Sequence, residues 1–169
     1  MSISVFDQVI VPLKRMLGNL DSIVTRAEQY ATNKDIDPGV LIQARLRPDM
    51  LPFVAQIRIA TDTAKGAAAR LSGSEVPKWA DDEETFADVH ERIGRAINYL
   101  GTMKPEQFEG AEKRNIELKL GPRTAKFVGT DYITGFVVPN FYFHVTTAYA
   151  ILRHNGVELG KSDYLGGLD

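Results

Sequence analysis

Apolar residues recur every three or four positions through the first thirty residues of the sequence. This spacing places them on one side of a helix, as in an amphipathic helix packed against a core. Pro12 lies inside the stretch and is expected to bend the helix, because proline removes one main-chain donor. Residues 40–46 then predict a short extra helical turn. The stripe consists of Val5, Ile10, Leu13, Met16, Leu17, Leu20, Ile23 and Val24.

Two further apolar stripes predict a second and a third helix. The second is expected to begin near Pro48, with Asp49 satisfying free amide donors at its start, and to end at Ser72-Gly73. The third is expected to run from about Phe86 to Leu100. The acidic run at residues 81–84 precedes it and is expected to favour its N-terminus by opposing the helix dipole.

The pattern changes between Gly110 and Gly129, where apolar and polar residues alternate on both sides of Gly121-Pro122. Alternation of this kind predicts a small β-hairpin. A last helix is expected over residues 131–154, apolar on nearly every side and ending at Asn155-Gly156, where a left-handed C-cap can form. A glycine-rich tail follows.

Four long helices, short connections and one hairpin predict an all-α protein. The expected architecture is an antiparallel four-helix bundle with a small β-hairpin insertion before the last helix. Residues 1–169 are expected to form one domain. Because the last helix is apolar nearly all round, it needs cover from the hairpin and tail or from a second subunit, so we expect a homodimer.

Composition narrows the possible partners. There are 20 basic and 22 acidic residues, for a net charge of -2, and no basic cluster, which argues against a nucleic-acid or membrane partner. The chain contains no cysteine, so it has neither disulfides nor thiolate metal sites. The start of the sequence lacks the features of a signal peptide, and no apolar run could span a bilayer. A cytoplasmic location is therefore expected.

Asn140 and His144 lie one turn apart in the apolar last helix. An unpartnered amide or imidazole in such a setting costs about 1 to 3 kcal/mol, so each side chain is expected to have a hydrogen-bond partner. Two interpretations stay open for His144. It is either a satisfied core histidine or a ligand-binding or catalytic residue.

Several segments carry a family resemblance. The chain resembles a bacterial family known as domain of unknown function number nineteen-ninety-three, which is grouped with the DinB/YfiT-like superfamily. The segments that carry it are Arg45-Leu-Arg-Pro-Asp-Met50, Pro52-Phe53 with Gln56, Pro139-Asn-Phe-Tyr-Phe-His144 and Leu159-Gly-Lys-Ser-Asp-Tyr-Leu-Gly166.

This resemblance implies a four-helix bundle and, in better-known members of the superfamily, a divalent metal such as zinc or nickel held by three histidines. One histidine is in helix two and two lie a turn apart in the last helix. His144 matches the first of that pair, but Ala148 takes the second place and Gln56 the place in helix two. A site assembled from His144, Gln56, Asp49 and water would bind metal weakly.

The resemblance and the tail composition suggest a further contact with His144. Asp163 and Tyr164 are expected to pack beside Asn140 and His144, with Asp163 orienting the imidazole. Taken together, these residues form the expected ligand pocket. It comprises Arg47, Asp49, Gln56, Asn140, His144, Asp163 and Tyr164.

Three functions remain open at this point. The first is a small-molecule binding protein that uses Gln56, Asn140 and His144 as hydrogen-bonding groups and retains only a degenerate metal triad. The second is a metal-dependent transferase or hydrolase with His144 as ligand or general base. The third is a dimeric, stress-related module in which Phe141 and Tyr142 anchor the interface.

Overall fold

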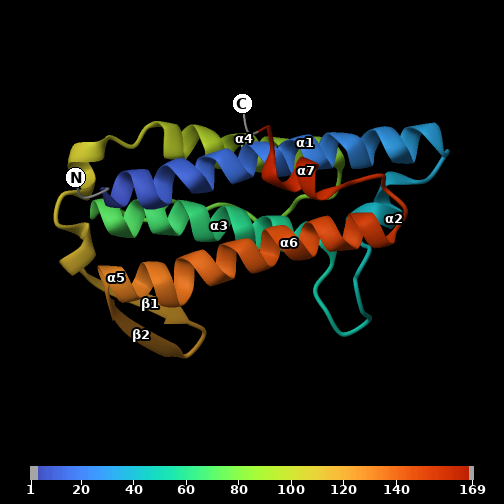
Figure 1. Cartoon of the computed structure of the whole chain (residues 1–169). Helices are drawn as coiled ribbons and strands as arrows, with labels where there is room; N and C mark the ends of the chain where they lie inside the picture. Colours follow the sequence, from blue (N-terminus) through green and yellow to red (C-terminus); the bar gives the residue numbers. More distant parts are fainter. Residues whose placement is uncertain (1–3, 168–169) are drawn as a thin grey trace.

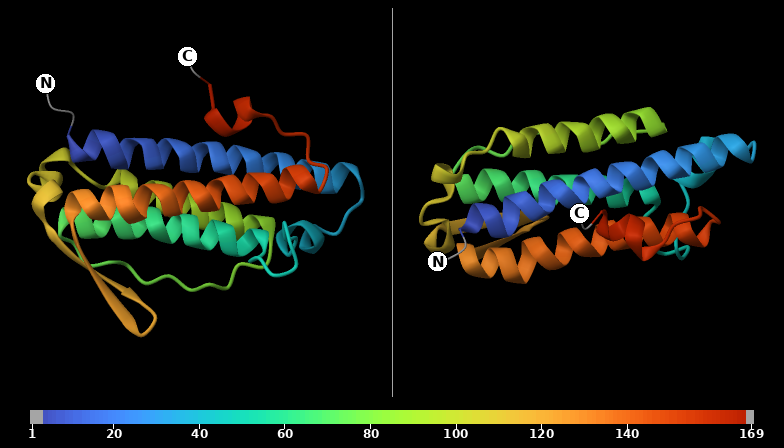
Figure 2. Two further views of the ribbon diagram at one scale, coloured as in Figure 1. Left: turned by 60° about the horizontal axis from the view of Figure 1, so that its bottom comes forward. Right: turned by 45° about the horizontal axis from the view of Figure 1, so that its top comes forward.

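A computed structural model describes residues 4–167 and is mostly helical (Figure 1). Four of its helices have 16 to 23 residues and lie alongside one another in all views (Figures 1 and 2). The prediction of a helical protein with a small hairpin is confirmed. The first three and last two residues of the sequence, including the end of the expected tail, lie outside the described part. The long helices are α1 (Val11–Asn33), α3 (Phe53–Ser72), α4 (Phe86–Gly101) and α6 (Val138–His154).

Pro12 and Pro139, the prolines inside the first and last predicted helices, each follow a π-helical turn. One such turn, Phe6–Ile10, leads into α1, and the other, Ile133–Val137, leads into α6. Pro12 and Pro139 are the second residues of these two α-helices. A proline has no N–H to offer to the preceding turn, so the wider hydrogen-bond pattern of a π-turn costs little there. The expected single helix over residues 131–154 is thus divided into α5 (Gly129–Tyr132), the π-turn and α6.

The second long helix begins later than predicted. Residues 44–52 are irregular after the short helix α2 (Pro38–Ile42), and α3 begins only at Phe53. Pro52 is the N-cap and is extended, and the Phe53 amide donates to the Ala44 carbonyl. The expectation that Asp49 caps this helix is therefore wrong. Proline near a helix start fits both Pro48 and Pro52, and only the second lies at the helix.

The start of α4 is satisfied by its own cap. Thr85 and Asp88 form a capping box in which the Thr85 hydroxyl accepts from the Asp88 amide and the Asp88 carboxylate accepts from the Thr85 amide. The acidic run at residues 81–84 was expected to serve this helix end. Instead, Glu83 from that run is buried and pairs with arginines, as described below.

The hairpin joins the long helices through aromatic packing. Strands β1 (Asn115–Leu120) and β2 (Arg123–Val128) pair antiparallel, with Leu120 opposite Arg123 across the Gly121-Pro122 turn. Phe127 from β2 packs against Tyr132 and Phe136 at ring distances of 5.8 and 6.5 Å. Tyr132 is fully buried, so the hairpin is fixed to the helix that follows it.

The C-terminal segment folds back onto α1. Helix α6 ends at His154 with Asn155 as its C-cap, and Gly156 adopts the left-handed conformation expected there, with φ of 95°. The short helix α7 (Lys161–Leu165) then packs beside α1, where the Asn19 amide donates to the Tyr164 carbonyl (Figure 1).

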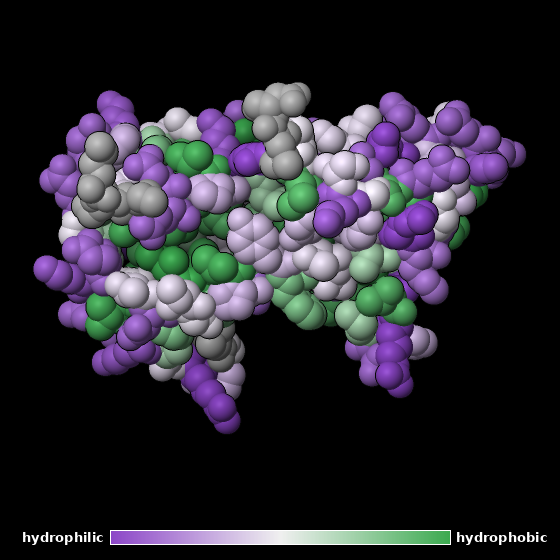
Figure 3. Space-filling model, in the orientation of Figure 1, coloured by the Kyte–Doolittle hydropathy of each residue, from purple (hydrophilic) through white to green (hydrophobic). Residues whose placement is uncertain are grey.

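Apolar side chains are visible on the face of the molecule drawn in Figure 3. In the view of Figure 3, hydrophobic residues gather between α1 and the first half of α6, while polar residues cover the ends of the molecule. Within residues 4–167, no helix is both long and apolar enough to cross a membrane.

Candidate functional site

His144 and Gln56 meet across the contact between α6 and α3. The His144 Nδ1 lies 2.7 Å from the Gln56 Oε1, and the Gln56 Nε2 donates to the Leu51 carbonyl at 2.9 Å. Both side chains are buried, His144 at 9% and Gln56 at 2% exposure. The prediction that His144 has a hydrogen-bond partner is confirmed.

This chain of bonds fixes the tautomer of the imidazole. The Leu51 carbonyl can only accept, so the Gln56 amide must turn its oxygen toward His144, whose Nδ1 then carries the proton. Burial lowers the pKa of the His144 imidazole, which favours its neutral form. The Nε2 atom is then an acceptor.

The Nε2 atom of His144 is not fully buried. Among residues 4–167 it has no hydrogen-bond partner, yet no fully buried side-chain nitrogen or oxygen in this part of the chain lacks one. Nε2 therefore reaches the surface. The site presents one fixed, neutral acceptor beside the Phe143 ring, which stands at 90° to the imidazole with ring centres 5.1 Å apart.

A second polar pair lies one turn along α6. The Asn140 side-chain amide donates to the Thr63 hydroxyl at 2.8 Å, so the expectation of a partner for Asn140 is also confirmed. Because α3 numbers rise from 56 to 63 as α6 numbers fall from 144 to 140, the two helices are antiparallel. Asn140 and Thr63 line a cleft of about 310 Å³ between α3, the hairpin and the start of α6, together with Phe136.

Arg47 and Asp49 lie in the irregular segment before α3. Their side chains are about three-quarters exposed and form an ion pair with each other at 3.4 Å. Leu51 connects this segment to the site, because its carbonyl binds Gln56. Within the described residues, no hydrogen bond or ion pair joins Arg47 or Asp49 to His144.

Asp163 does not orient the imidazole. One carboxylate oxygen of Asp163 accepts from the Gly160 amide at 2.7 Å, and the other pairs with Arg26 of α1 at 2.9 Å. Tyr164 bonds to the Thr146 hydroxyl at 2.9 Å. The expectation placed both tail residues beside His144. The role expected of Asp163 is corrected, because α7 caps its own start with Asp163 and packs on α1, while the packing of Tyr164 beside His144 stays a prediction.

The described residues do not fit the metal site implied by the family resemblance. Ala148, one turn after His144, is fully buried and has no donor atom, and the Gln56 oxygen is already bonded to the His144 Nδ1. Residues 4–167 hold no group of three histidine, cysteine or acidic side chains placed to share an ion. His144 alone cannot define a zinc or nickel centre.

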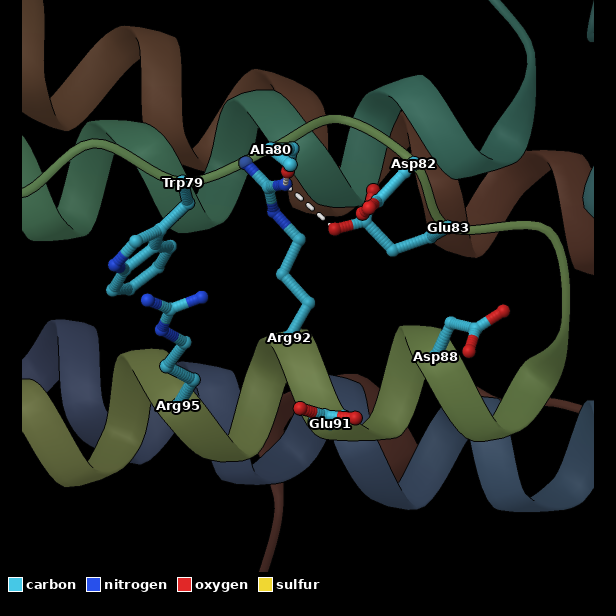
Figure 4. A pocket seen from close by; sticks show the side chains of 8 residues that line it. All are labelled: Trp79, Ala80, Asp82, Glu83, Asp88, Glu91, Arg92 and Arg95. Carbon is cyan, nitrogen blue, oxygen red and sulfur yellow. Dashed lines mark hydrogen bonds and ion pairs between the residues drawn. The ribbon is translucent and has the colours of Figure 1, made fainter.

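Sequence reasoning missed a buried charge network on the other side of α3. Arg92 of α4 is 4% exposed and reaches the connection formed by residues 74–85, where it donates to the Ala80 carbonyl (Figure 4). It pairs with Glu83 at 2.6 Å, Asp81 at 2.9 Å and Asp62 at 3.0 Å. The only sequence signal was an arginine in the apolar stripe of the third helix, one residue before Ile93.

The ion pairs of this network keep Glu83 and Arg92 charged despite their burial. Burial opposes ionisation of Glu83, but hydrogen bonds from Arg92 and Arg58 outweigh it and lower the pKa of Glu83. Burial likewise opposes the charge on Arg92, whose pKa is raised by Glu83 and the nearby aspartates. Lys65 and Arg95 lie over the Trp79 ring at 4.3 and 4.8 Å. Because its buried groups are mutually satisfied, we interpret the network as structural.

Comparisons with known proteins place the chain in a family without assigning a reaction. The crystal structure of a DinB family member protein from Shewanella denitrificans is similar to it, with a TM-score of 0.90 and 39% identity over 96% of this chain and 92% of that one. The search of curated proteins finds no match. The model of the domain of unknown function DUF1993 matches residues 5–165, nearly the whole chain, and the protein therefore belongs to the DUF1993 family.

Proposed function

We propose that the protein is a non-catalytic binding protein for a small molecule, held at the strip formed by Gln56, His144 and Asn140. The observation that carries the proposal is the fixed imidazole of His144, whose Nδ1 is bonded to Gln56 while Nε2 faces solvent as an acceptor. A pre-set acceptor in a partly apolar surround is a common element of ligand sites.

The chemistry of the strip defines the ligand class. A ligand needs a hydrogen-bond donor, a hydroxyl or an N–H, for the His144 Nε2. Phe143 provides an aromatic surface beside that atom. The cleft beside Asn140 and Thr63 offers room for the rest of a small molecule, and its volume of about 310 Å³ is near the lower end of typical ligand pockets, about 300 to 1,000 Å³.

The decisive experiment compares wild type and His144→Ala for bound metal and bound organic ligand. Purified protein is dialysed and challenged with zinc, nickel and manganese before elemental analysis, and a native sample is analysed by mass spectrometry. His154→Ala is the matched control, because His154 is exposed at the end of α6. We expect no stoichiometric metal in any of the three proteins, and a small molecule that His144→Ala alone loses.

Two outcomes would overturn the proposal. Stoichiometric metal lost only in His144→Ala would favour a metal-dependent transferase or hydrolase. Absence of any retained molecule, together with no shift of the His144 signals in a ligand screen by NMR, would favour a dimeric, stress-related module.

We also propose the finer architecture. Residues 1–169 are taken as one cytoplasmic domain, an antiparallel four-helix bundle that forms a homodimer. The packing of α3 between α6 and α4, and of α1 against α4, supports the bundle. Exposed apolar residues of α6 support the dimer, which is tested below.

A further inference from the structure

An apolar cleft of about 490 Å³ is lined by residues between positions 6 and 18 and between positions 97 and 103, and none of the His144 site residues lines it. It is formed by the π-turn and first turns of α1 on one side and by the end of α4 on the other. Its walls include Phe6, Ile10, Ile97 and Met103. The volume falls within the range of small-molecule pockets, about 300 to 1,000 Å³.

Glycine keeps part of this cleft open. Gly18 lines it from the middle of α1, and a Cβ at that position would meet no heavy atom within 4 Å. Glycine inside a helix costs about 1 kcal/mol relative to alanine. No conformational need explains it here, because the φ of Gly18 is not positive. Its effect is to leave empty space where α1 faces the cleft.

One lysine that lines the same cleft, Lys14, has no hydrogen-bond or ion-pair partner among residues 4–167. Its Nζ lies 3.2 Å from where a Cβ on Gly101 would be, so the ammonium group is above the α4 end of the cleft. The other cation there, Arg15, is occupied, because it donates to the carbonyls of Leu165 and Gly167.

We propose that this cleft binds a small amphipathic monoanion, an aliphatic or aromatic body with one carboxylate. The apolar walls match the body, and the free charge of Lys14 matches the carboxylate. One available cation favours one negative charge on the ligand. This site is independent of the site at His144.

The test measures binding of decanoate to the full chain by calorimetry, with decanol as the uncharged probe. Decanoate is expected to bind wild type at least tenfold more tightly than decanol. Lys14→Gln is expected to weaken decanoate binding by about tenfold and to leave decanol unchanged, since a charge-assisted contact is lost. His144→Ala should bind decanoate as wild type does, which separates this site from the proposed function.

Two glycine variants provide a matched pair. Gly18→Leu fills the cleft and is expected to abolish binding. Gly94→Leu adds the same side chain at a position on α4 that also has open space around a Cβ but does not line the cleft, and it should bind normally. Thermal unfolding of both variants checks that they fold.

Three results would overturn the proposal. One is the absence of decanoate binding to wild type at concentrations up to about 1 mM. A Kd of that size corresponds to a binding free energy of only about 4 kcal/mol. A second is equal binding by Gly18→Leu and Gly94→Leu. The third is a Lys14→Gln variant that loses stability but not affinity, which would assign Lys14 to the partial negative charge at the end of α4.

Discussion

His144 combines a buried ring with one open nitrogen, and its pH behaviour follows from that combination. Burial lowers the pKa of the imidazole below its ordinary value of about 6.5. The unfolded chain then binds more protons than the folded chain as the pH falls through this value. The free energy of unfolding contributed by neutral His144 is complete above about pH 6.5 and declines as the pH falls toward the lowered pKa.

We therefore expect a pH-dependent difference between wild type and His144→Gln in urea unfolding. The stability advantage of wild type should shrink as the pH falls below about 6.5. Gln56→Leu should cost about 1 to 3 kcal/mol, because it leaves the His144 N–H unpaired. His154→Gln serves as the exposed control. Identical pH profiles for His144→Gln and wild type would show that burial does not perturb this ring.

At the scale of elements, the connection between α3 and α4 is held by charge. Glu83 is 7% exposed and pairs with Arg58 and Arg92, each at 2.6 Å. Its pKa is lowered, so its contribution to stability is present above the ordinary glutamate value of about 4.3 and is lost as the pH falls through the lowered one. Removing one member of a buried ion pair costs about 3 to 5 kcal/mol.

Glu83→Gln is therefore expected to destabilise the protein by about 3 kcal/mol at pH 7 and to flatten the loss of stability below about pH 4. Trp79, the single tryptophan, lies against Lys65 and Arg95 in this connection, so its fluorescence reports the change. Glu91→Gln removes an equal charge from an exposed residue of α4 that lies near the network (Figure 4). An equal effect of both variants would contradict a specific role for Glu83.

Periodicity predicted the elements whose faces are apolar and missed the contacts made between segments distant in sequence. The α4 stripe and the hairpin alternation are local signals, and both elements formed where expected. The family resemblance placed Gln56 and His144 in one expected pocket, but it did not predict the hydrogen bond between them, because no local pattern relates residues 56 and 144. The start of α3 was misplaced since two prolines carry the same signal. Asp163 was misplaced because its contacts depend on how α7 meets α1.

At the scale of the whole molecule, the exposed surface of α6 is where we expect a second copy of the chain to bind. Phe141 was expected to anchor an interface but is fully buried in the core, since its side of the helix faces the other helices. Phe143 is instead 57% exposed. Apolar residues also remain visible between α1 and α6 (Figure 3). A stable dimer needs about 800 Å² from each partner, and this side offers an apolar centre for such an interface.

Phe143→Glu is expected to convert a homodimer into a monomer, because a carboxylate in the centre of an apolar interface would be desolvated without a partner. Light scattering after size-exclusion chromatography measures the change in mass. Protein concentrations of about 10 to 100 μM cover the range of moderate dimer affinities. Val40→Glu is the matched control, because Val40 on α2 is also 57% exposed. If both variants remain dimeric, the interface lies elsewhere. If wild type is monomeric throughout this concentration range, we assign the exposed Phe143 side chain to the ligand site beside His144. Phe143→Glu should then weaken ligand binding without changing the molecular mass in solution.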